Sequence, residues 1–154
     1  MSFGFRICKV KFAATAFDGY GARYNGGRWN SPGSAVVYLA ATPASAMMEM
    51  LVHADTMLLS LSYVLIRAEF ADDLVEELPN PLDKNWRVNL AITQEIGDDF
   101  VARSFKPLLR VPSALVTREF NYVVNPAHAE FRQIVIGNAE PLMIDDRLKR
   151  LFSK

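Results

Sequence analysis

The chain has 154 residues, about half of them hydrophobic, which is enough to build one domain around a buried core. Its 17 basic residues balance 17 acidic residues, so the overall charge lacks the positive field expected of a protein that neutralises many nucleic-acid phosphates. The apolar runs are far shorter than the roughly 20 residues that span a bilayer, and the N-terminus lacks a secretory signal pattern. We therefore expect a single cytoplasmic domain over residues 1–154, with no direct binding of nucleic acid or membrane.

Several short segments have the period-two alternation, or the β-branched and aromatic content, of β-strands. We expect strands at 5–12, 34–40, 61–70, 108–111, 114–116, 131–137 and 141–144. A long loop over 13–33 separates the first two strands, and no repeat or low-complexity tract interrupts the chain.

Helical signals lie between the strands. Thr42 is followed by proline, which places a hydroxyl at the cap and proline at the first helical position, and predicts a helix over 43–58. Apolar residues at helical spacing predict a second helix over 90–105, with Gly97 as a candidate break. A terminal helical turn follows at 145–152. Because strands and helices do not alternate regularly, we expect a mixed α/β (α+β) domain with a largely antiparallel sheet.

The glycine-rich loop "GARYNGGRWNSPG" (21–33) has the composition of an anion-binding loop. Gly26 and Gly27 allow the backbone to approach a ligand and present N–H groups, while Arg28 offers a planar fork to a phosphate or carboxylate. The alternative is a surface turn with solvated arginines and with Trp29 packed onto the core. The composition of the loop leaves both interpretations open.

Glu49 stands in a helix that is hydrophobic on nearly every side, and we expect it to be buried. A buried carboxylate needs a partner or a function. An ion pair with Arg28 or Arg23 is one explanation, and a role in catalysis is the other. His53 lies one turn later, but no third ligand accompanies the pair, so we expect no metal site and interpret His53 as structural or peripheral.

Other polar positions have local explanations when they are considered separately. Tyr38 shares a strand face with core positions, as expected of a core tyrosine with a hydrogen-bonded hydroxyl. Ser113 lacks the sequence pattern of a nucleophile elbow, and Asn125 precedes proline as turn formers do. The single Cys8 cannot form an internal disulfide and is expected in the first strand.

Taken together and in order, the motifs "GGRWNSPG", "VVYLA", "ASAMMEMLVH", "LRVPSALV" and "NYVVNPAH" resemble those of the RES-domain family. The resemblance runs from about Gly19 to the terminal "DDRL", and several irregular motifs occur in the same order. Carried over position by position, the arginine of the family falls on Arg28, the tyrosine on Tyr38, the glutamate on Glu49 and the serine on Ser113.

This resemblance implies a fold similar to that of ADP-ribosyltransferase toxins. It also implies a toxin of a two-gene toxin-antitoxin module, paired with a helix-turn-helix (Xre-like) antitoxin, in assemblies compatible with a homo-oligomer. NAD would be the substrate, with no prosthetic group, and its nicotinamide–ribose bond would be cleaved by hydrolysis or phosphorolysis. ADP-ribosyl transfer to a protein is an alternative, as is a non-catalytic module that binds a nucleotide or a partner.

Roles follow for individual residues under this resemblance. Arg28, with the amides of Gly26 and Gly27, would hold the NAD pyrophosphate, because guanidinium groups suit phosphate oxygens. Glu49 would stabilise the oxocarbenium-like ribosyl centre or bind the ribose hydroxyls.

The remaining positions would contact the nicotinamide end of the substrate. Tyr38 would stack on or orient the nicotinamide, and Ser113 would hydrogen-bond nicotinamide or ribose without attacking it. Asn30 and Asn121 are further candidates for polar contacts.

Overall fold

The computed structural model describes residues 1–53, 61–78 and 81–151. The described strands are β1 (Ser2–Lys9), β2 (Val37–Ala40), β3 (Tyr63–Phe70), β4 (Val75–Glu77), β5 (Leu108–Pro112), β6 (Phe120–Val124) and β7 (Val135–Leu142). The described helices are α1 (Tyr20–Asn25), α2 (Pro43–Val52), α4 (Leu90–Arg103) and α5 (Asp146–Leu151), with 3-10 turns η1 (Val10–Thr15), η2 (Asp72–Leu74) and η3 (Ala129–Gln133). None of these helices is long and apolar enough to cross a bilayer.

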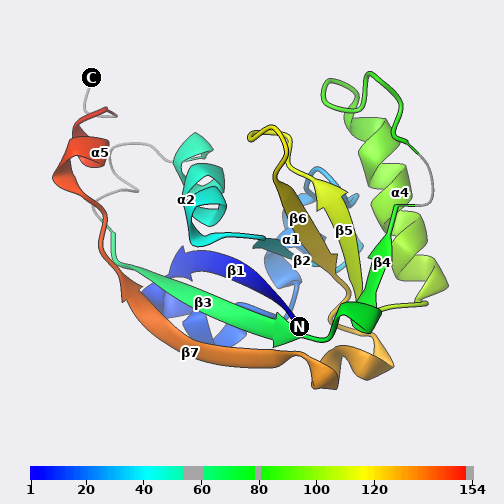
Figure 1. Ribbon diagram of the computed structural model, residues 1–154, viewed down its shortest axis with the longest axis horizontal. Helices are drawn as coiled ribbons and strands as arrows, with labels where there is room; N and C mark the ends of the chain where they lie inside the picture. The colour runs from blue at the N-terminus through cyan, green and yellow to red at the C-terminus, as the bar shows by residue number, and fades with distance from the viewer. Residues whose placement is uncertain (54–60, 79–80, 152–154) are drawn as a thin grey trace.

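The strands form one mixed sheet in the order β4-β5-β6-β2-β1-β3-β7. Every neighbouring pair is antiparallel except β4 and β5, which confirms the expected α+β class and the largely antiparallel sheet. Within the described chain, β1 and β2 are joined at one pair, Phe5 and Ala40. Figure 1 shows that the two halves of the sheet separate beyond this point, with β1, β3 and β7 on one side and β2, β6, β5 and β4 on the other.

Two apolar clusters pack against the half of the sheet formed by β2, β6, β5 and β4. Alternation along β6 sends Val123 to the face that α4 covers, where a cluster contains Trp29 and Phe100. The opposite face carries a second cluster around Phe70 and Tyr122, whose rings meet edge to face with centroids 5.0 Å apart. Both faces of these strands are therefore buried, which fixes their register.

Helix α2 begins as expected. The Thr42 side chain accepts a hydrogen bond from the Ser45 backbone N–H at 3.1 Å, and proline occupies the first turn. The helix ends at Val52, and the part of the prediction beyond 53 lies outside the described residues. The expectation that this helix is buried nearly all round is wrong, because Met48 and Val52 are exposed and only one stripe packs on β1 and β2.

Helix α4 runs without interruption through Gly97, so the expected break is absent. This glycine allows close packing instead. A Cβ built at Gly97 would lie 1.6 Å from the carbonyl oxygen of Trp29, so only a hydrogen atom fits there. The helix thereby presses directly on the backbone of the glycine-rich loop.

Several predicted strand boundaries were wrong, and each error has a local cause. The first strand ends at Lys9, since the chain tightens into η1, and the second begins only at Val37. The expected strand 114–116 is a turn. In place of strands 131–137 and 141–144, one 3-10 turn precedes a single strand, β7, which tolerates Pro141 because it is an edge strand.

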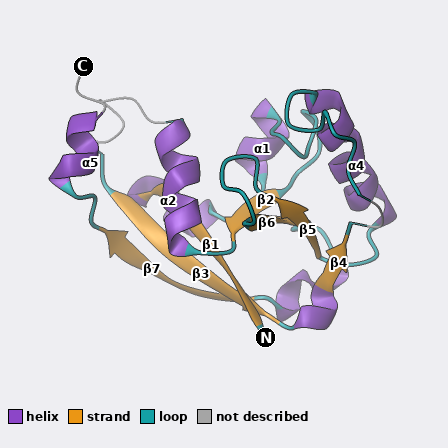
Figure 2. Cartoon of the chain, turned by 45° about the horizontal axis from the view of Figure 1, so that its top comes forward, coloured by secondary structure: helices purple, strands orange, loops and turns teal. Residues whose placement is uncertain are grey.

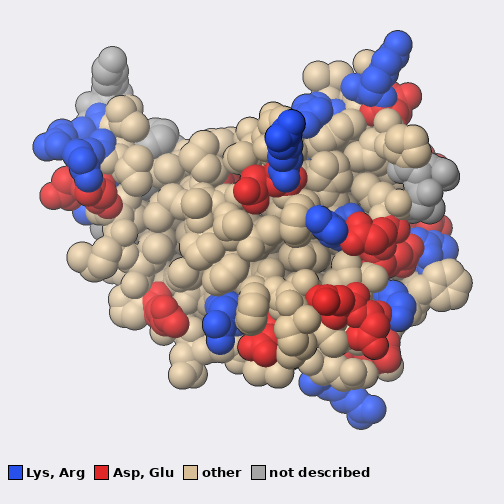
Figure 3. Space-filling view, in the orientation of Figure 1, with Lys and Arg blue, Asp and Glu red and all other residues tan. Residues whose placement is uncertain are grey.

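Several elements were missed. The expected loop 13–33 contains the second half of η1 and all of α1, and the strands β4 and β6 were not predicted. Strand β6 carries Asn121 among apolar residues and lies centrally, between β5 and β2. On the face shown in Figure 3, basic and acidic side chains alternate instead of forming a continuous basic surface.

Candidate functional site

A cleft of ≈ 810 Å³ opens where β1 and β2 separate. Its lining comes from β1 and β2, from α1 with the glycine-rich loop, from α2, from the start of α4 and from the turn after β5, with one residue each from β3 and β6. Arg28, Tyr38, Glu49 and Asn121 all line this cleft, together with Gly26 and Gly27. Figures 1 and 2 both place α2 above β1, on one side of the opening. Residues from distant parts of the sequence therefore meet in one cleft.

The glycine-rich loop is shaped by its two glycines. Gly26 ends α1 with a φ of 70°, a region that favours glycine, and allows the chain to turn into the loop. Gly27 donates its N–H to the Asn30 carbonyl at 2.9 Å, and a Cβ at this position would lie 2.7 Å from the Tyr38 hydroxyl oxygen. Both glycines line the cleft, which favours the interpretation of this segment as a ligand-binding loop over that of a surface turn.

Asn30 has a structural role inside the glycine-rich loop, which the sequence analysis did not predict. Its side chain is fully buried and does not line the cleft. Its amide nitrogen lies 2.8 Å from the Ala22 carbonyl and 3.0 Å from that of Ser34, while its Oδ1 accepts a hydrogen bond from the Tyr38 hydroxyl at 2.6 Å. Asn30 therefore holds the glycine-rich loop together from inside.

Tyr38 joins this network from β2. Its hydroxyl accepts the Trp29 backbone N–H at 3.0 Å while donating to Asn30. Burial raises the pKa of the Tyr38 phenol well above its ordinary value, so the hydroxyl stays protonated at neutral pH. Tyr38 is also one of the residues that line the cleft. Tyr38 is thus both the hydrogen-bonded core tyrosine and a cleft residue.

The glycine-rich loop is also tied to α4. The Gln94 side chain donates to the Gly27 carbonyl at 3.0 Å, and Asp98 Oδ1 accepts the Ser31 backbone N–H at 3.0 Å. Burial would raise the pKa of Asp98, but hydrogen bonds from Ser31 and Ser34 outweigh it and hold the pKa below its usual range. These contacts fix the loop before any ligand arrives.

Arg28 is half-buried on the cleft wall. One of its terminal nitrogens donates to the backbone carbonyl of Arg87 at 3.1 Å. Among the described residues it makes no ion pair, and in particular none with Glu49. The positive charge of Arg28 is therefore not neutralised by a carboxylate of the described chain.

Arg6 is a cleft residue that the sequence analysis missed. It stands on β1 at the separation of the two strands, where one terminal nitrogen donates to the Tyr38 carbonyl at 3.3 Å. Its Nε is buried with no hydrogen-bond partner among the described residues. Burial lowers the pKa of Arg6, yet a guanidinium group stays charged at neutral pH. The only available signal was a basic residue inside the alternating first strand.

Glu49 reaches the cleft from α2 and is half-buried, less enclosed than we expected. Its Oε1 accepts a hydrogen bond from the Asn121 amide at 2.9 Å. The Asn121 Oδ1 is buried without a partner among the described residues and belongs to a cleft-lining side chain. His53 is exposed at the cleft, one turn beyond Glu49. The partner of Glu49 is thus a neutral amide, and not the arginine that the ion-pair explanation required.

Ser113 does not line this cleft. It is buried, and its Oγ accepts the backbone N–H groups of Leu115 at 3.2 Å and Val116 at 3.1 Å. This bonding shapes the turn after β5, which carries Ala114 and Leu115 into the cleft. Asn125 is likewise a buried turn former, as predicted, since its Oδ1 accepts the Ala127 N–H at 3.0 Å.

Within the parts of the chain that the structure describes, no three His, Cys, Asp or Glu side chains come together as metal ligands would. The cleft instead combines two uncompensated guanidinium groups, one carboxylate and one neutral phenol. Such a set suits an elongated ligand with an anionic part and a part that develops positive charge.

Comparison with known proteins agrees with the order of motifs along the chain. The model of the RES domain family matches residues 4–145. "Toxin Res" of Yersinia enterocolitica is 36% identical over 150 residues, covering 94% of this chain and 98% of that protein. "Prs ADP-ribosylating toxin" of a Sphingobium species is 31% identical over 145 residues, covering 90% of each chain. "Toxin Res" of Photorhabdus laumondii is 31% identical over 134 residues, covering 85% of this chain and 86% of that protein.

Proposed function

Because the chain belongs to the RES-domain family, we propose that it is a toxin that consumes NAD by breaking the bond between nicotinamide and ribose. The observation that carries this proposal is the meeting of Glu49 with Arg6 and Arg28 around one cleft of ≈ 810 Å³. The cleft is of the size of typical small-molecule sites. Hydrolysis and phosphorolysis both begin with this bond cleavage, and the choice between them depends on the acceptor.

Arg28 and Arg6 would hold the pyrophosphate. The two guanidinium groups approach the cleft from the glycine-rich loop and from β1, and neither is neutralised by a carboxylate within the described chain. Planar guanidinium groups bind phosphate oxygens in pairs. The Gly26–Gly27 backbone supports close approach on the same wall.

Glu49 would act where the bond breaks. Loss of neutral nicotinamide leaves positive charge on the ribosyl centre, which a nearby carboxylate stabilises. The hydrogen bond from Asn121 fixes one carboxylate oxygen of Glu49 and leaves the other for the ribose. The unpartnered Asn121 Oδ1 suits a hydroxyl or carboxamide N–H of the substrate.

Tyr38 and Ser113 take different parts in this proposal. Tyr38 would present its ring to the nicotinamide, because its hydroxyl is held by Trp29 and Asn30. Ser113 would position the turn that places Ala114 and Leu115 on the cleft wall. Asn30 would support the site from within the glycine-rich loop.

The decisive experiment incubates the purified protein with NAD, with and without phosphate, and resolves the products by mass. Nicotinamide with ADP-ribose indicates hydrolysis, and ADP-ribose 1″-phosphate formed only with phosphate indicates phosphorolysis. We expect Glu49→Gln to lower kcat by about 100- to 1000-fold, because it removes the charge that stabilises the transition state.

Glu140→Gln is a matched control, because Glu140 is exposed on β7 and does not line the cleft. Circular dichroism and melting temperature check that both variants fold. Full NAD turnover by a folded Glu49→Gln variant would reject the proposed role of Glu49. Intact NAD with the wild-type protein would favour a binding module, unless a protein acceptor gains ADP-ribose.

ADP-ribosyl transfer to a protein is the second candidate, because the Sphingobium relative is named an ADP-ribosylating toxin. Transfer would use the same cleft and replace water or phosphate with a protein side chain. Incubation with labelled NAD and a bacterial lysate separates the two, since transfer leaves the label on a protein band and NAD degradation leaves it in small molecules.

A helix-turn-helix antitoxin remains the expected protein partner, and the oligomeric state of the chain stays open. Val52 and Leu115 support a docking region at the cleft, because both line it and are exposed. An antitoxin bound there would block access of NAD. Co-expression with a neighbouring helix-turn-helix protein, followed by NAD assays of the complex, tests this expectation.

A further inference from the structure

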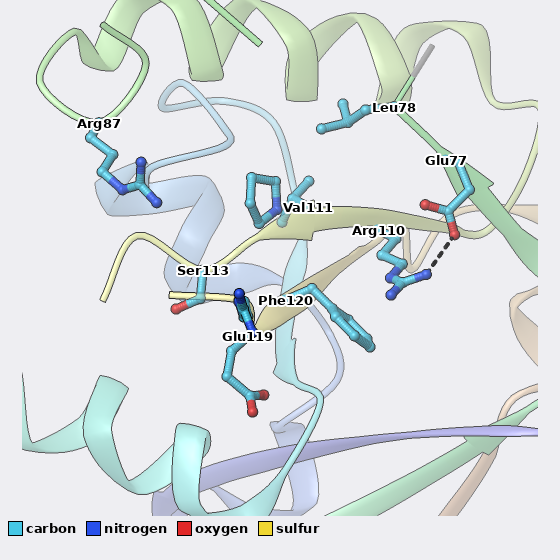
Figure 4. A pocket seen from close by; sticks show the side chains of 10 residues that line it. Glu77, Leu78, Arg87, Arg110, Val111, Ser113, Glu119 and Phe120 are labelled. Atoms are coloured by element: carbon cyan, nitrogen blue, oxygen red, sulfur yellow. Dashed lines mark hydrogen bonds and ion pairs between the residues drawn. The ribbon is translucent and has the colours of Figure 1, made fainter. Parts of the chain in front are cut away.

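A second, smaller hollow lies beside the β5–β6 turn, outside the main cleft. Its volume is ≈ 270 Å³, about a third of that of the main cleft. Three arginines, Arg87, Arg110 and Arg118, take part in its lining. Figure 4 shows the side chain of Arg87 reaching from the loop before α4 toward Ser113. The size and lining of the hollow suit a small anionic group.

Arg87 and Arg118 are not neutralised by carboxylates of the described chain. Arg87 lies over the Trp86 ring, with its guanidinium carbon 4.5 Å from the ring centroid, and makes no ion pair there. Arg118 makes no side-chain hydrogen bond or ion pair among the described residues. Both side chains belong to exposed residues at the hollow and can turn toward an anion.

The two carboxylates at this hollow already have partners. Glu77 pairs with Arg110 at 3.2 Å, and the Arg110 guanidinium carbon lies 3.7 Å from the Phe120 ring centroid. Glu119 accepts a hydrogen bond from the Ser45 hydroxyl at 3.3 Å, and Figure 4 shows its carboxylate turned toward α2. Three positive and two negative side chains give the hollow a net charge of +1. The positive charge is concentrated on Arg87 and Arg118.

The backbone of the turn presents Arg118 at a fixed place. Ser113 donates its N–H to the Glu119 carbonyl at 2.9 Å, while its Oγ accepts two further N–H groups of the turn. Arg118 has a φ of 70°, a left-handed conformation that non-glycine residues adopt at a cost. The buried Ser113 therefore sets the position from which Arg118 reaches the hollow.

The hollow is connected to the main cleft through one hydrogen bond. The Arg28 guanidinium, on the wall of the cleft, donates to the backbone carbonyl of Arg87 at 3.1 Å. The turn after β5 links the two spaces in the same way, since Leu115 lines the cleft and Arg118 lines the hollow. An anion in the hollow would thus bind next to the wall that carries Arg28.

We propose that this hollow is a phosphate-binding site, formed by Arg87 and Arg118 with Arg110 behind them. The phosphate is either inorganic phosphate or the phosphate group of a small phosphorylated sugar. Guanidinium groups bind phosphate oxygens through paired hydrogen bonds, and two such groups on one hollow suit a dianion. The proposal concerns binding of phosphate alone and stands independently of the NAD reaction.

Isothermal titration calorimetry with sodium phosphate at pH 7.5, at an ionic strength held constant with sodium chloride, measures this binding. We expect Arg87→Gln and Arg118→Gly to weaken phosphate binding at least about tenfold. Glycine at 118 suits the positive φ, so this variant keeps the turn while removing the charge. Arg132→Gln is the control, because Arg132 is exposed on η3 and away from the hollow.

The ligand arms separate the two sources of phosphate. Ribose 5-phosphate binding at least tenfold tighter than inorganic phosphate would identify a sugar phosphate as the ligand, and equal affinities would identify inorganic phosphate. Two results would overturn the proposal. One is phosphate binding that persists in Arg87→Gln and Arg118→Gly and is lost in Arg28→Gln, which would place phosphate in the main cleft. The other is the absence of saturable binding of either compound to the wild-type protein.

Discussion

The two walls of the cleft are built in different ways. The part of the glycine-rich loop that follows α1, residues 26–33, is held by buried side chains and by α4, with Asn30 fully buried and Gly97 packed against Trp29. Helix α2, which carries Glu49, buries one stripe on the sheet. It makes two side-chain hydrogen bonds to the β5–β6 hairpin, one from Ser45 to Glu119 in the turn and one from Asn121 of β6 to Glu49. The loop wall is rigid although it lacks regular structure, and the helical wall is the less constrained of the two.

This difference assigns separate physical tasks to the walls. A preorganised loop holds an anion without paying to order its own backbone on binding. A helix held by few side-chain contacts allows the carboxylate of Glu49 to adjust to a substrate. Damage to the loop wall should therefore appear first as lost stability, and damage to the contacts of Glu49 should appear first as lost activity.

The largest expected loss of stability comes from Gly97→Ala. A Cβ at this position would collide with the backbone of Trp29, and a backbone contact cannot move aside as a flexible side chain can. We expect the free energy of unfolding to fall by about 3 kcal/mol or more, measured by urea denaturation. Gly21→Ala is the control, because nothing lies within 4 Å of a Cβ there. Equal stability of the two variants would refute the close contact between α4 and the loop.

Asn30→Ala should destabilise the protein somewhat less. The change removes the donor to the Ala22 and Ser34 carbonyls and the acceptor of the Tyr38 hydroxyl, all inside the protein. Because these buried polar groups would then lack partners, we expect the free energy of unfolding to fall by about 2 kcal/mol. Asn138→Ala, at an exposed position of β7, controls for the substitution itself. If Asn30→Ala raised the KM for NAD while its melting temperature stayed at the wild-type value, Asn30 would be a ligand contact instead.

The sequence predicted local structure where a residue type favours one particular backbone conformation, such as a helix cap or a turn. Thr42 with the following proline predicted the start of α2, and Asn125 predicted a turn. Each of these depends on backbone conformation within a few residues, which side-chain chemistry largely determines. Glu49 and Arg28, which the resemblance of the motifs selected, line the same cleft, and their roles there stay a prediction.

Long-range partners were not predictable in this way. Asn30 and Asn121 are the same residue type, and the sequence does not distinguish their roles. The side chain of Asn30 is buried within the loop, whereas that of Asn121 bonds to Glu49, 72 positions away in the chain. A basic residue in the first strand was too weak a signal to predict Arg6 as a cleft residue, because its role depends on the separation of β1 from β2, which is a property of the sheet. Ser113 was expected at the ligand and instead shapes a turn, since its neighbours in space come from the turn's own backbone. Burial and strand pairing decide these cases.

Asn121→Ala tests the helical wall. Loss of the amide that bonds to the Glu49 carboxylate should lower kcat for NAD cleavage about tenfold, because the carboxylate is no longer held in one orientation. The melting temperature should change little. Ser45→Ala removes the bond from α2 to Glu119, just before β6, and should leave kcat near the wild-type value. A rise in KM with unchanged kcat in Asn121→Ala would show that Asn121 contributes uniform binding and does not orient Glu49.

The smallest effect concerns Asp98, which holds the loop wall from α4 through the Ser31 N–H. The pKa of Asp98 lies below its usual range in the folded protein: burial would raise it, but hydrogen bonds from Ser31 and Ser34 outweigh burial. A lowered folded pKa means that the ionised group stabilises the fold above the unfolded pKa of about 3.9, and that this stabilisation is lost as the pH falls through the folded value.

Asp98→Ala should therefore lower the free energy of unfolding by about 1 kcal/mol at pH 7, a modest figure because the carboxylate is largely screened by solvent. The gap from the wild-type protein should close below about pH 4. Asp99→Ala removes only an exposed contact to Arg103 and should cost less. A gap for Asp98→Ala that stays constant from pH 7 to pH 3 would mean that packing, and not the charge on this carboxylate, secures the loop to α4.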